Sequence, residues 1–165
     1  MAHNQDEFEQ VALVHTRGLL QFSRRLTGSS TTAEDLVQEA LLLAWRSFHQ
    51  FQRGTNARAW LFRIVVNTWY GWVRKAKPAV VAPVIVSGDI QGALEIVEAL
   101  DQLPEEQRAV ISLVIVEGFT CRESAEILDI PIGTVMSRLS RGRKTLQAGL
   151  GGKEAVAIAE GQKTS

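Results

Sequence analysis

Four cations occupy a seven-residue stretch near the C-terminus: Arg138, Arg141, Arg143 and Lys144. No Asp or Glu occurs between residues 131 and 152, so no acid nearby in the sequence offsets this charge. Guanidinium and ammonium groups on one helix bind DNA phosphates, and an arginine in the major groove also binds the edge of guanine. The stretch therefore indicates a helix that contacts duplex DNA.

The residues before this stretch predict the turn that would present it. Thr120 is a suitable cap for a short helix, Pro131 prevents that helix from continuing, and Thr134 is a suitable cap for a second one. The side chains expected to point outward from the second helix are Thr134, Ser137, Arg138, Arg141 and Lys144. This order predicts a helix-turn-helix DNA-binding unit, with a solvated helical hairpin as the alternative.

A second group of candidate contacts lies on a helix expected over residues 57–75. Trp69, Tyr70 and Trp72 sit at successive angles around this helix, whereas Trp60 is assigned chiefly to the core. The basic residues beside the rings are Arg63, Arg74, Lys75 and Lys77. Aromatic faces stack on unpaired bases while cations hold the strand's backbone, so the group predicts contact with single-stranded DNA.

Residues that commonly carry catalysis are sparse. His3, His15 and His49 have no metal-ligand spacing with one another or with Cys121, and no Ser/His/Asp set stands out. We therefore expect no catalytic site, no metal and no cofactor. The single cysteine excludes an internal disulfide and fits a reducing compartment.

The charge distribution indicates that the chain binds DNA as part of a larger assembly. The net charge is zero, but residues 1–78 hold 10 Lys or Arg against 6 acids, and residues 79–106 hold 6 acids with no Lys or Arg. Residues 107–165 again hold more Lys or Arg than acids, 8 against 6. Two basic segments on either side of an acidic one, in a chain without net charge, predict DNA binding within an assembly. No apolar run reaches the roughly 20 residues of a membrane span, and the N-terminus lacks a signal pattern, so we expect a cytoplasmic protein without membrane insertion.

Helical periodicity predicts an all-α chain with a first domain over residues 5–78. One amphipathic helix is expected over residues 5–26, ended by Gly28. The capping-box spacing of Thr31 and Glu34 predicts the start of a second helix that reaches about residue 50. With the helix over 57–75, these form one small helical domain.

A second helical domain is predicted over residues 94–148. A Val-rich, proline-interrupted linker over residues 79–93 precedes it. Helices are expected over residues 93–103 and 104–116, the latter with Pro104 in its first turn. The polar tail over residues 149–165 is expected to be disordered.

Four motifs in order, at residues 33–46, 54–68, 103–108 and 133–139, resemble an extracytoplasmic-function (ECF) sigma factor. The resemblance covers residues 8–147. It implies a promoter-recognition subunit of bacterial RNA polymerase with two helical domains, regions two and four, joined by a flexible linker. The partners it implies are core RNA polymerase, promoter DNA and, as is common in the group, an anti-sigma factor.

The resemblance also implies roles for individual residues. Those matching the polymerase-docking surface are Asp35, Gln38 and Glu39. Those matching contacts with the −35 element as duplex are Arg122, Thr134, Ser137, Arg138 and Arg141, to which the charge pattern adds Lys144. The candidates for melting and reading the −10 element are Asn56, Arg63, Asn67, Trp69, Tyr70, Trp72, Arg74, Lys75 and Lys77.

Two departures from the family pattern affect the recognition helix. Met136 stands where a lysine is usual, so one phosphate contact is expected to be missing. Gly142 replaces a common alanine, which predicts either an early end of the helix or close packing against a neighbour.

Two other classes of protein remain as alternatives. One is a two-component or quorum-type regulator, whose receiver domain or ligand-binding sheet is not apparent in the sequence. The other is an enzyme.

Overall fold

The computed structural model describes residues 2–75 and 99–149, and every regular element within them is helical. The chain falls into two compact units, Met1–Ala82 and Pro83–Ser165, which are described separately. The all-α fold class with two helical units is confirmed. Lys77, the linker predicted over 79–93 and the tail beyond Gly149 lie outside the described residues, and the predicted domain limits stay predictions.

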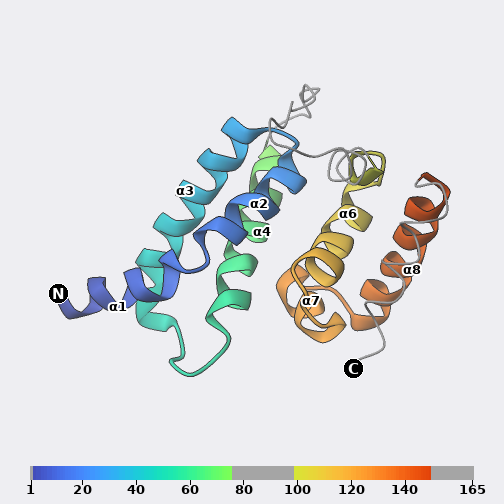
Figure 1. The fold of residues 1–165 in the computed structure, drawn as a ribbon. Coiled ribbons are helices and arrows are strands. Elements are labelled where there is room, and N and C mark those ends of the chain that lie inside the picture. Colours follow the sequence, from blue (N-terminus) through green and yellow to red (C-terminus); the bar gives the residue numbers. More distant parts are fainter. Residues whose placement is uncertain (1, 76–98, 150–165) are drawn as a thin grey trace. The chain divides into compact units, whose positions relative to one another are not determined.

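The first unit is built on three helices that lie side by side (Figure 1). Helix α3 (Ser30–Ser47) packs against both α2 (Thr16–Thr27) and α4 (Ala57–Lys75). Helix α1 (Ala2–Leu13) precedes them, and a short 3-10 helix, η1 (Phe48–Gln50), follows α3. The side chains buried between α2, α3 and α4 include Leu19, Phe22, Leu36, Leu61, Phe62 and Val65. The helix predicted over 57–75 is confirmed at both ends.

The single helix predicted over residues 5–26 is wrong, because the chain breaks at Val14 and His15. The Thr16 hydroxyl donates to the carbonyl of Ala12 at 3.1 Å, and the backbone N–H of His15 donates to the same carbonyl at 3.1 Å. The expected end of the helix is confirmed, since Gly28 adopts φ 67° and donates its N–H to Arg24.

The cap predicted for α3 is displaced by two residues. Ser29, not Thr31, is the N-cap: its hydroxyl accepts the backbone N–H of Thr32 at 3.2 Å. Thr31 instead lies inside the first turn. The serine is the better cap because its extended backbone (φ −138°) precedes the first helical residue.

The second unit contains α6 (Glu105–Ile111), a π-helical turn η2 (Ser112–Val116), α7 (Cys121–Leu128) and α8 (Ile132–Gly149). Helix α8 packs against α6 and α7. The helix predicted over 104–116 therefore ends in a π-helical turn. Pro104 is the N-cap of α6 rather than a residue of its first turn.

Arg108 explains part of the motif over residues 103–108. Its Nε donates to the carbonyl of Leu100, and its Nη2 donates to those of Asp101 and Leu103, each at 3.0 Å. These carbonyls come at the end of a helical turn, where regular backbone bonds run out; that of Leu100 also accepts the backbone N–H of Leu103 at 3.1 Å. Arg108 thereby fixes the segment that enters α6.

Gly142 lies in the middle of α8, so an early end of the recognition helix is excluded. A Cβ at this position would lie 2.8 Å from Cγ1 and 3.1 Å from Cδ1 of Ile111, which is 1% exposed. Close packing of α8 on α6 is the reason that a glycine fits here. Of the two consequences expected from a glycine in place of the family's alanine, the structure therefore supports close packing against a neighbouring helix.

Candidate nucleic-acid interface

Helix α7 and the turn that follows it have the geometry of a helix-turn-helix unit. Thr120 caps α7 as expected: its hydroxyl accepts the N–H of Glu123 at 3.1 Å, and the Glu123 carboxylate accepts the N–H of Thr120 at 2.8 Å. The helix ends at Asp129, whose φ of 53° is left-handed. This reversal of the chain after eight residues directs it into α8.

The start predicted for the second helix is wrong. Pro131, rather than Thr134, precedes the helix, and its carbonyl accepts the N–H groups of Thr134 and Val135. A proline suits this position because it needs no N–H donor of its own at a helix start. Thr134 consequently sits within the first turn of α8 and is half-buried.

The apolar side of α8 is buried as the sequence predicts, but Thr134 and Arg138, which were expected to point outward, are half-buried. Val135, Leu139 and Leu146 are buried against the rest of the unit. The candidate −35 contacts that are exposed are Arg122, Ser137, Arg141 and Lys144. Met136 and Ile132 are also exposed, at 57% and 46%. The surface offers cations and a hydroxyl to a duplex, with apolar side chains beside them.

Arg138 differs from the other candidate −35 residues because it already has an acidic partner. Its Nη2 lies 3.3 Å from Oε2 of Glu106 on α6, and the side chains are 23% and 69% exposed. Glu106 lies 32 residues before Arg138, so the absence of acids close to Arg138 in the chain gave no indication of this pair. A contact between two helices leaves no local signal in the sequence.

The candidate −10 residues on α4 divide into exposed polar groups and half-buried rings. Arg63, Asn67, Arg74 and Lys75 are exposed, whereas Trp69, Tyr70 and Trp72 are half-buried. Trp72 donates its indole Nε1–H to Oε2 of Glu39 on α3 at 3.0 Å. The rings thus lie at the surface of the unit without being fully solvated.

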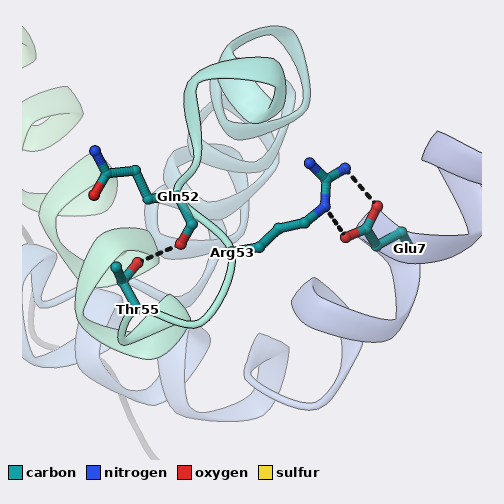
Figure 2. Close-up of polar contacts among 4 residues, drawn as sticks. All are labelled: Glu7, Gln52, Arg53 and Thr55. Atoms are coloured by element: carbon teal, nitrogen blue, oxygen red, sulfur yellow. Dashed lines mark hydrogen bonds and ion pairs between the residues drawn. The ribbon is translucent and has the colours of Figure 1, made fainter.

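The short loop that leads into α4 carries another candidate, Asn56. Its Oδ1 accepts the backbone N–H of Ala59 at 3.0 Å, so the side chain caps α4. Thr55 closes the turn before it by donating its hydroxyl to the carbonyl of Gln52 at 2.6 Å, as Figure 2 shows. Asn56 therefore has a structural role as a helix cap in addition to the −10 contact expected of it.

Trp60 belongs to a group of rings at the end of the first unit. Its ring centroid lies 4.9 Å from that of Phe51 and 6.3 Å from that of Phe48. Phe8 contacts Phe48 and Trp45 edge-on, at 5.2 and 5.3 Å. The packing role predicted for Trp60 agrees with these contacts, although its side chain is only half-buried.

The candidate polymerase-docking residues share one face of α3. Asp35, Gln38 and Glu39 are all exposed, and Leu42, one turn further on, is 48% exposed. Residues three, four and seven apart lie on the same side of a helix. This face therefore presents two carboxylates, an amide and a leucine to a partner.

One histidine close to α4 is perturbed. Burial lowers the pKa of His15 below its ordinary value of 6.5, and the nearby charge of Arg58 lowers it further. The guanidinium of Arg58 lies 5.1 Å above the ring of Phe62, which places its charge on α4. His15 is therefore held more readily as the neutral imidazole in the folded unit.

Two family models match the chain in the expected order. Sigma-70 region 2 matches residues 13–78, and Sigma-70 region 4 matches residues 93–146. The chain is 37% identical over 153 residues to the ECF RNA polymerase sigma factor EcfG of Rhodopseudomonas palustris, covering 87% of this chain and 84% of the relative. The chain belongs to the ECF RNA polymerase sigma factors. The SigW sigma factor of Bacillus subtilis is 30% identical over 87% of this chain and 89% of its own.

Solved structures agree with this assignment. The sigma factor RpoE of Bartonella quintana, solved in complex with the anti-sigma factor NepR, is 33% identical with a TM-score of 0.77, covering 87% of this sigma factor and 96% of that chain. CnrH, solved with the cytosolic domain of CnrY, is 27% identical with a TM-score of 0.68, each chain being covered to 87%. Across residues 2–75 and 99–149, none of the sigma factor's helices combines the length and apolar character needed to cross a membrane.

Proposed function

We propose that this sigma factor binds core RNA polymerase through α3 and directs transcription from promoters whose −35 duplex it reads with α8. In the same proposal, α4 and the loop before it bind the −10 element once it is single-stranded. The protein carries out no catalysis itself; the polymerase supplies the chemistry. Its place of action is the cytoplasm, where the polymerase and the DNA are.

The observation that carries the −35 role is the division of α8 into two sides. Val135 and Leu139 are buried, while Arg141 and Lys144 are exposed on the side away from them. A helix that follows a capped helix and a tight turn, with cations on its free face, suits the major groove and its phosphates. The side chains proposed to contact the −35 duplex are Arg122, Thr134, Ser137, Arg138, Arg141 and Lys144.

The −10 role is supported by the composition of the α4 surface. Half-buried rings can stack on bases with their outer faces, and the exposed cations can hold the phosphates between them. The described residues proposed for this contact are Asn56, Arg63, Asn67, Trp69, Tyr70, Trp72, Arg74 and Lys75. Lys77, which lies outside the described residues, is proposed to extend the same basic stretch.

We further propose that an anti-sigma factor restrains this protein. Two similar sigma factors were solved with such partners or with a partner's cytosolic domain, namely RpoE with NepR and CnrH with CnrY. An anti-sigma factor that covers α3 would compete with the polymerase for Asp35, Gln38 and Glu39. Addition of the product of an adjacent gene to the reconstituted holoenzyme would test this by loss of transcription.

Reconstituted transcription tests the proposed function. Core polymerase, this sigma factor and a randomised promoter library are mixed, and the transcribed sequences are recovered. The proposal predicts enrichment of one −35 and one −10 element, each dependent on the sigma factor. Core polymerase alone, and the sigma factor alone, are the controls. Transcripts that start without any shared upstream element would contradict the proposal.

A further inference from the structure

The loop over residues 51–56 is tied to α1 by an ion pair between residues 46 positions apart in sequence. We infer that Glu7 on α1 is a positioning residue for this loop, and that it thereby sets the base preference of the sigma factor at the −10 element. The inference rests on the proposed function, in which Asn56 and α4 bind the melted strand.

The pair has the geometry of a two-point clamp. Arg53 donates its Nε–H to Oε1 of Glu7 at 2.5 Å and its Nη2–H to Oε2 at 2.7 Å, as Figure 2 shows. A planar guanidinium that meets a carboxylate through two parallel bonds fixes orientation as well as distance. The hydrogen bond with Glu7 also raises the pKa of Arg53 above its ordinary value.

The loop is short and bonded internally, so a fixed Arg53 limits where Asn56 can lie. The backbone N–H and the hydroxyl of Thr55 both donate to the carbonyl of Gln52, at 3.2 and 2.6 Å. Gly54 between them has a φ of 87°, a left-handed conformation that glycine adopts without strain. Asn56 follows directly and caps α4, which links the turn to the helix of the candidate −10 residues.

A group of aromatic rings connects α1 to the loop independently of the ion pair. Phe8, next to Glu7, contacts Phe48, whose ring stacks on Phe51 with centroids 5.8 Å apart. Phe51 is the first residue of the loop and contacts Trp60 on α4. When the ion pair is lost, the ring contacts still attach α1 to the rest of the unit. The effect of losing the ion pair is therefore confined to the outer part of the loop.

The exposure of the pair separates positioning from folding. The side chains of Arg53 and Glu7 are 65% and 28% exposed. Ion pairs with this much solvent around them add little to stability, and salt weakens them further. A bidentate contact that contributes little to folding but spans α1 and a loop of the candidate interface is better explained by control of the loop's position.

Base preference in the assembled holoenzyme tests the inference. The probes are forked DNA fragments with the library-selected −35 duplex and a single-stranded −10 strand, made with each of the four bases at each −10 position. Holoenzyme is formed with the wild type, Glu7→Gln, Arg53→Gln and the exchanged pair Glu7→Arg with Arg53→Glu. Glu9→Gln is the matched control, because Glu9 is an exposed acid on α1 whose amide partner, Gln5, lies on the same helix.

The inference predicts a loss of selectivity without a loss of folding. Both single variants should reduce the affinity ratio between the best and the other bases by about two- to fivefold, the range expected for an exposed pair. The exchanged pair should restore the ratio, Glu9→Gln should keep it, and thermal unfolding and −35 duplex binding should stay at wild-type values. Salt should reduce the difference between wild type and Glu7→Gln.

Two results would overturn the inference alone, and a third would overturn the proposed function as well. If Glu7→Gln and Arg53→Gln keep the wild-type base ratios, the clamp does not control the −10 preference even though the proposed function stands. If the single variants lower the melting temperature and the affinity for every probe equally, the pair is structural. A wild-type holoenzyme without any base preference at −10 would instead overturn the proposed function, and this inference with it.

Discussion

Trp72 on α4 donates its indole Nε1–H to the Glu39 carboxylate on α3 at 3.0 Å. Trp72 belongs to the proposed −10 surface, and Glu39 belongs to the proposed polymerase-docking surface. A partner that binds the Glu39 carboxylate competes with this hydrogen bond. The two proposed surfaces are therefore in direct contact, and variants of Glu39 act on both.

Charge reversal on α3 tests the docking surface. Asp35→Lys combined with Glu39→Lys should abolish association with core polymerase, because both carboxylates are exposed on one face of the helix. Thermal unfolding should show a loss of only about 0.5–1.5 kcal/mol, because Glu39→Lys removes the acceptor of the Trp72 indole whereas an exposed charge such as Asp35 adds little. Pull-down of polymerase subunits, with circular dichroism beside it, measures both.

The single variants separate docking from the hydrogen bond with Trp72. Asp35→Lys should weaken polymerase binding alone, whereas Glu39→Lys should also alter binding of single-stranded −10 DNA. Retention of polymerase by the double variant would show that docking occurs elsewhere.

Three variants test the recognition helix. Arg141→Ala and Arg138→Ala should each weaken holoenzyme binding to the −35 duplex, by about 1–3 kcal/mol if the arginine contacts a base. Glu106→Gln should strengthen it and steepen its salt dependence, because it removes the carboxylate that lies 3.3 Å from Arg138 while keeping a hydrogen-bond acceptor. Fluorescence anisotropy across a salt series measures both quantities. Unchanged −35 binding in both arginine variants would refute the assignment of α8.

His15 makes the stability of the first unit depend on pH. Because its pKa is lowered in the folded state, the unfolded chain binds the proton more readily below pH 6.5. Stability should therefore fall as pH drops below 6.5 and level off below the folded-state pKa. Denaturant unfolding at a series of pH values should show this slope in the wild type and a smaller slope in His15→Gln. Identical slopes in both proteins would show that His15 does not contribute.

Gly142→Ala tests the close approach of α8 to α6. Alanine improves helix propensity by about 1 kcal/mol, but a Cβ at 2.8 Å from the buried Ile111 forces repacking that typically costs about 1–3 kcal/mol. The net expectation is a destabilisation of about 1 kcal/mol. Gly71→Ala in α4 is the matched control, since nothing lies within 4 Å of a Cβ there, and it should stabilise. Thermal melts of both variants show whether the gain in helix propensity or the cost of repacking around Ile111 is larger.

Sequence patterns were sufficient where the determining contacts are local. The cap at Thr120, the helix end at Gly28 and the apolar side of α8 all depend on residues a few positions apart. The caps assigned to Thr31 and Thr134 were wrong because the nearby residues Ser29 and Pro131 occupy the positions at which these helices begin. A pattern identifies which residues can cap a helix but not which of two neighbours does.

The contacts that shape the candidate site could not be predicted in this way. Glu106 with Arg138 joins α6 to α8, Glu39 with Trp72 joins α3 to α4, and both depend on how helices pack. The break at Val14 and His15 leaves no signal in the spacing of the apolar residues, which continues across it into α2. These features follow from tertiary geometry, for which a single sequence carries no periodic signal.

Permanganate footprinting of promoter thymines in the holoenzyme tests the central claim most directly, because it detects bases that have left the duplex. We predict reactive −10 thymines only when core polymerase and this protein are both present. Trp69→Ala, Tyr70→Ala and Trp72→Ala should each reduce this reactivity, losing about 1–3 kcal/mol of single-strand binding per stacked base, while −35 binding persists. Trp60→Ala should instead destabilise the unit, by about 3 kcal/mol, and reduce every activity together. If no thymine becomes reactive with the wild-type holoenzyme, or if the three α4 variants only destabilise the fold, the account of promoter melting is contradicted.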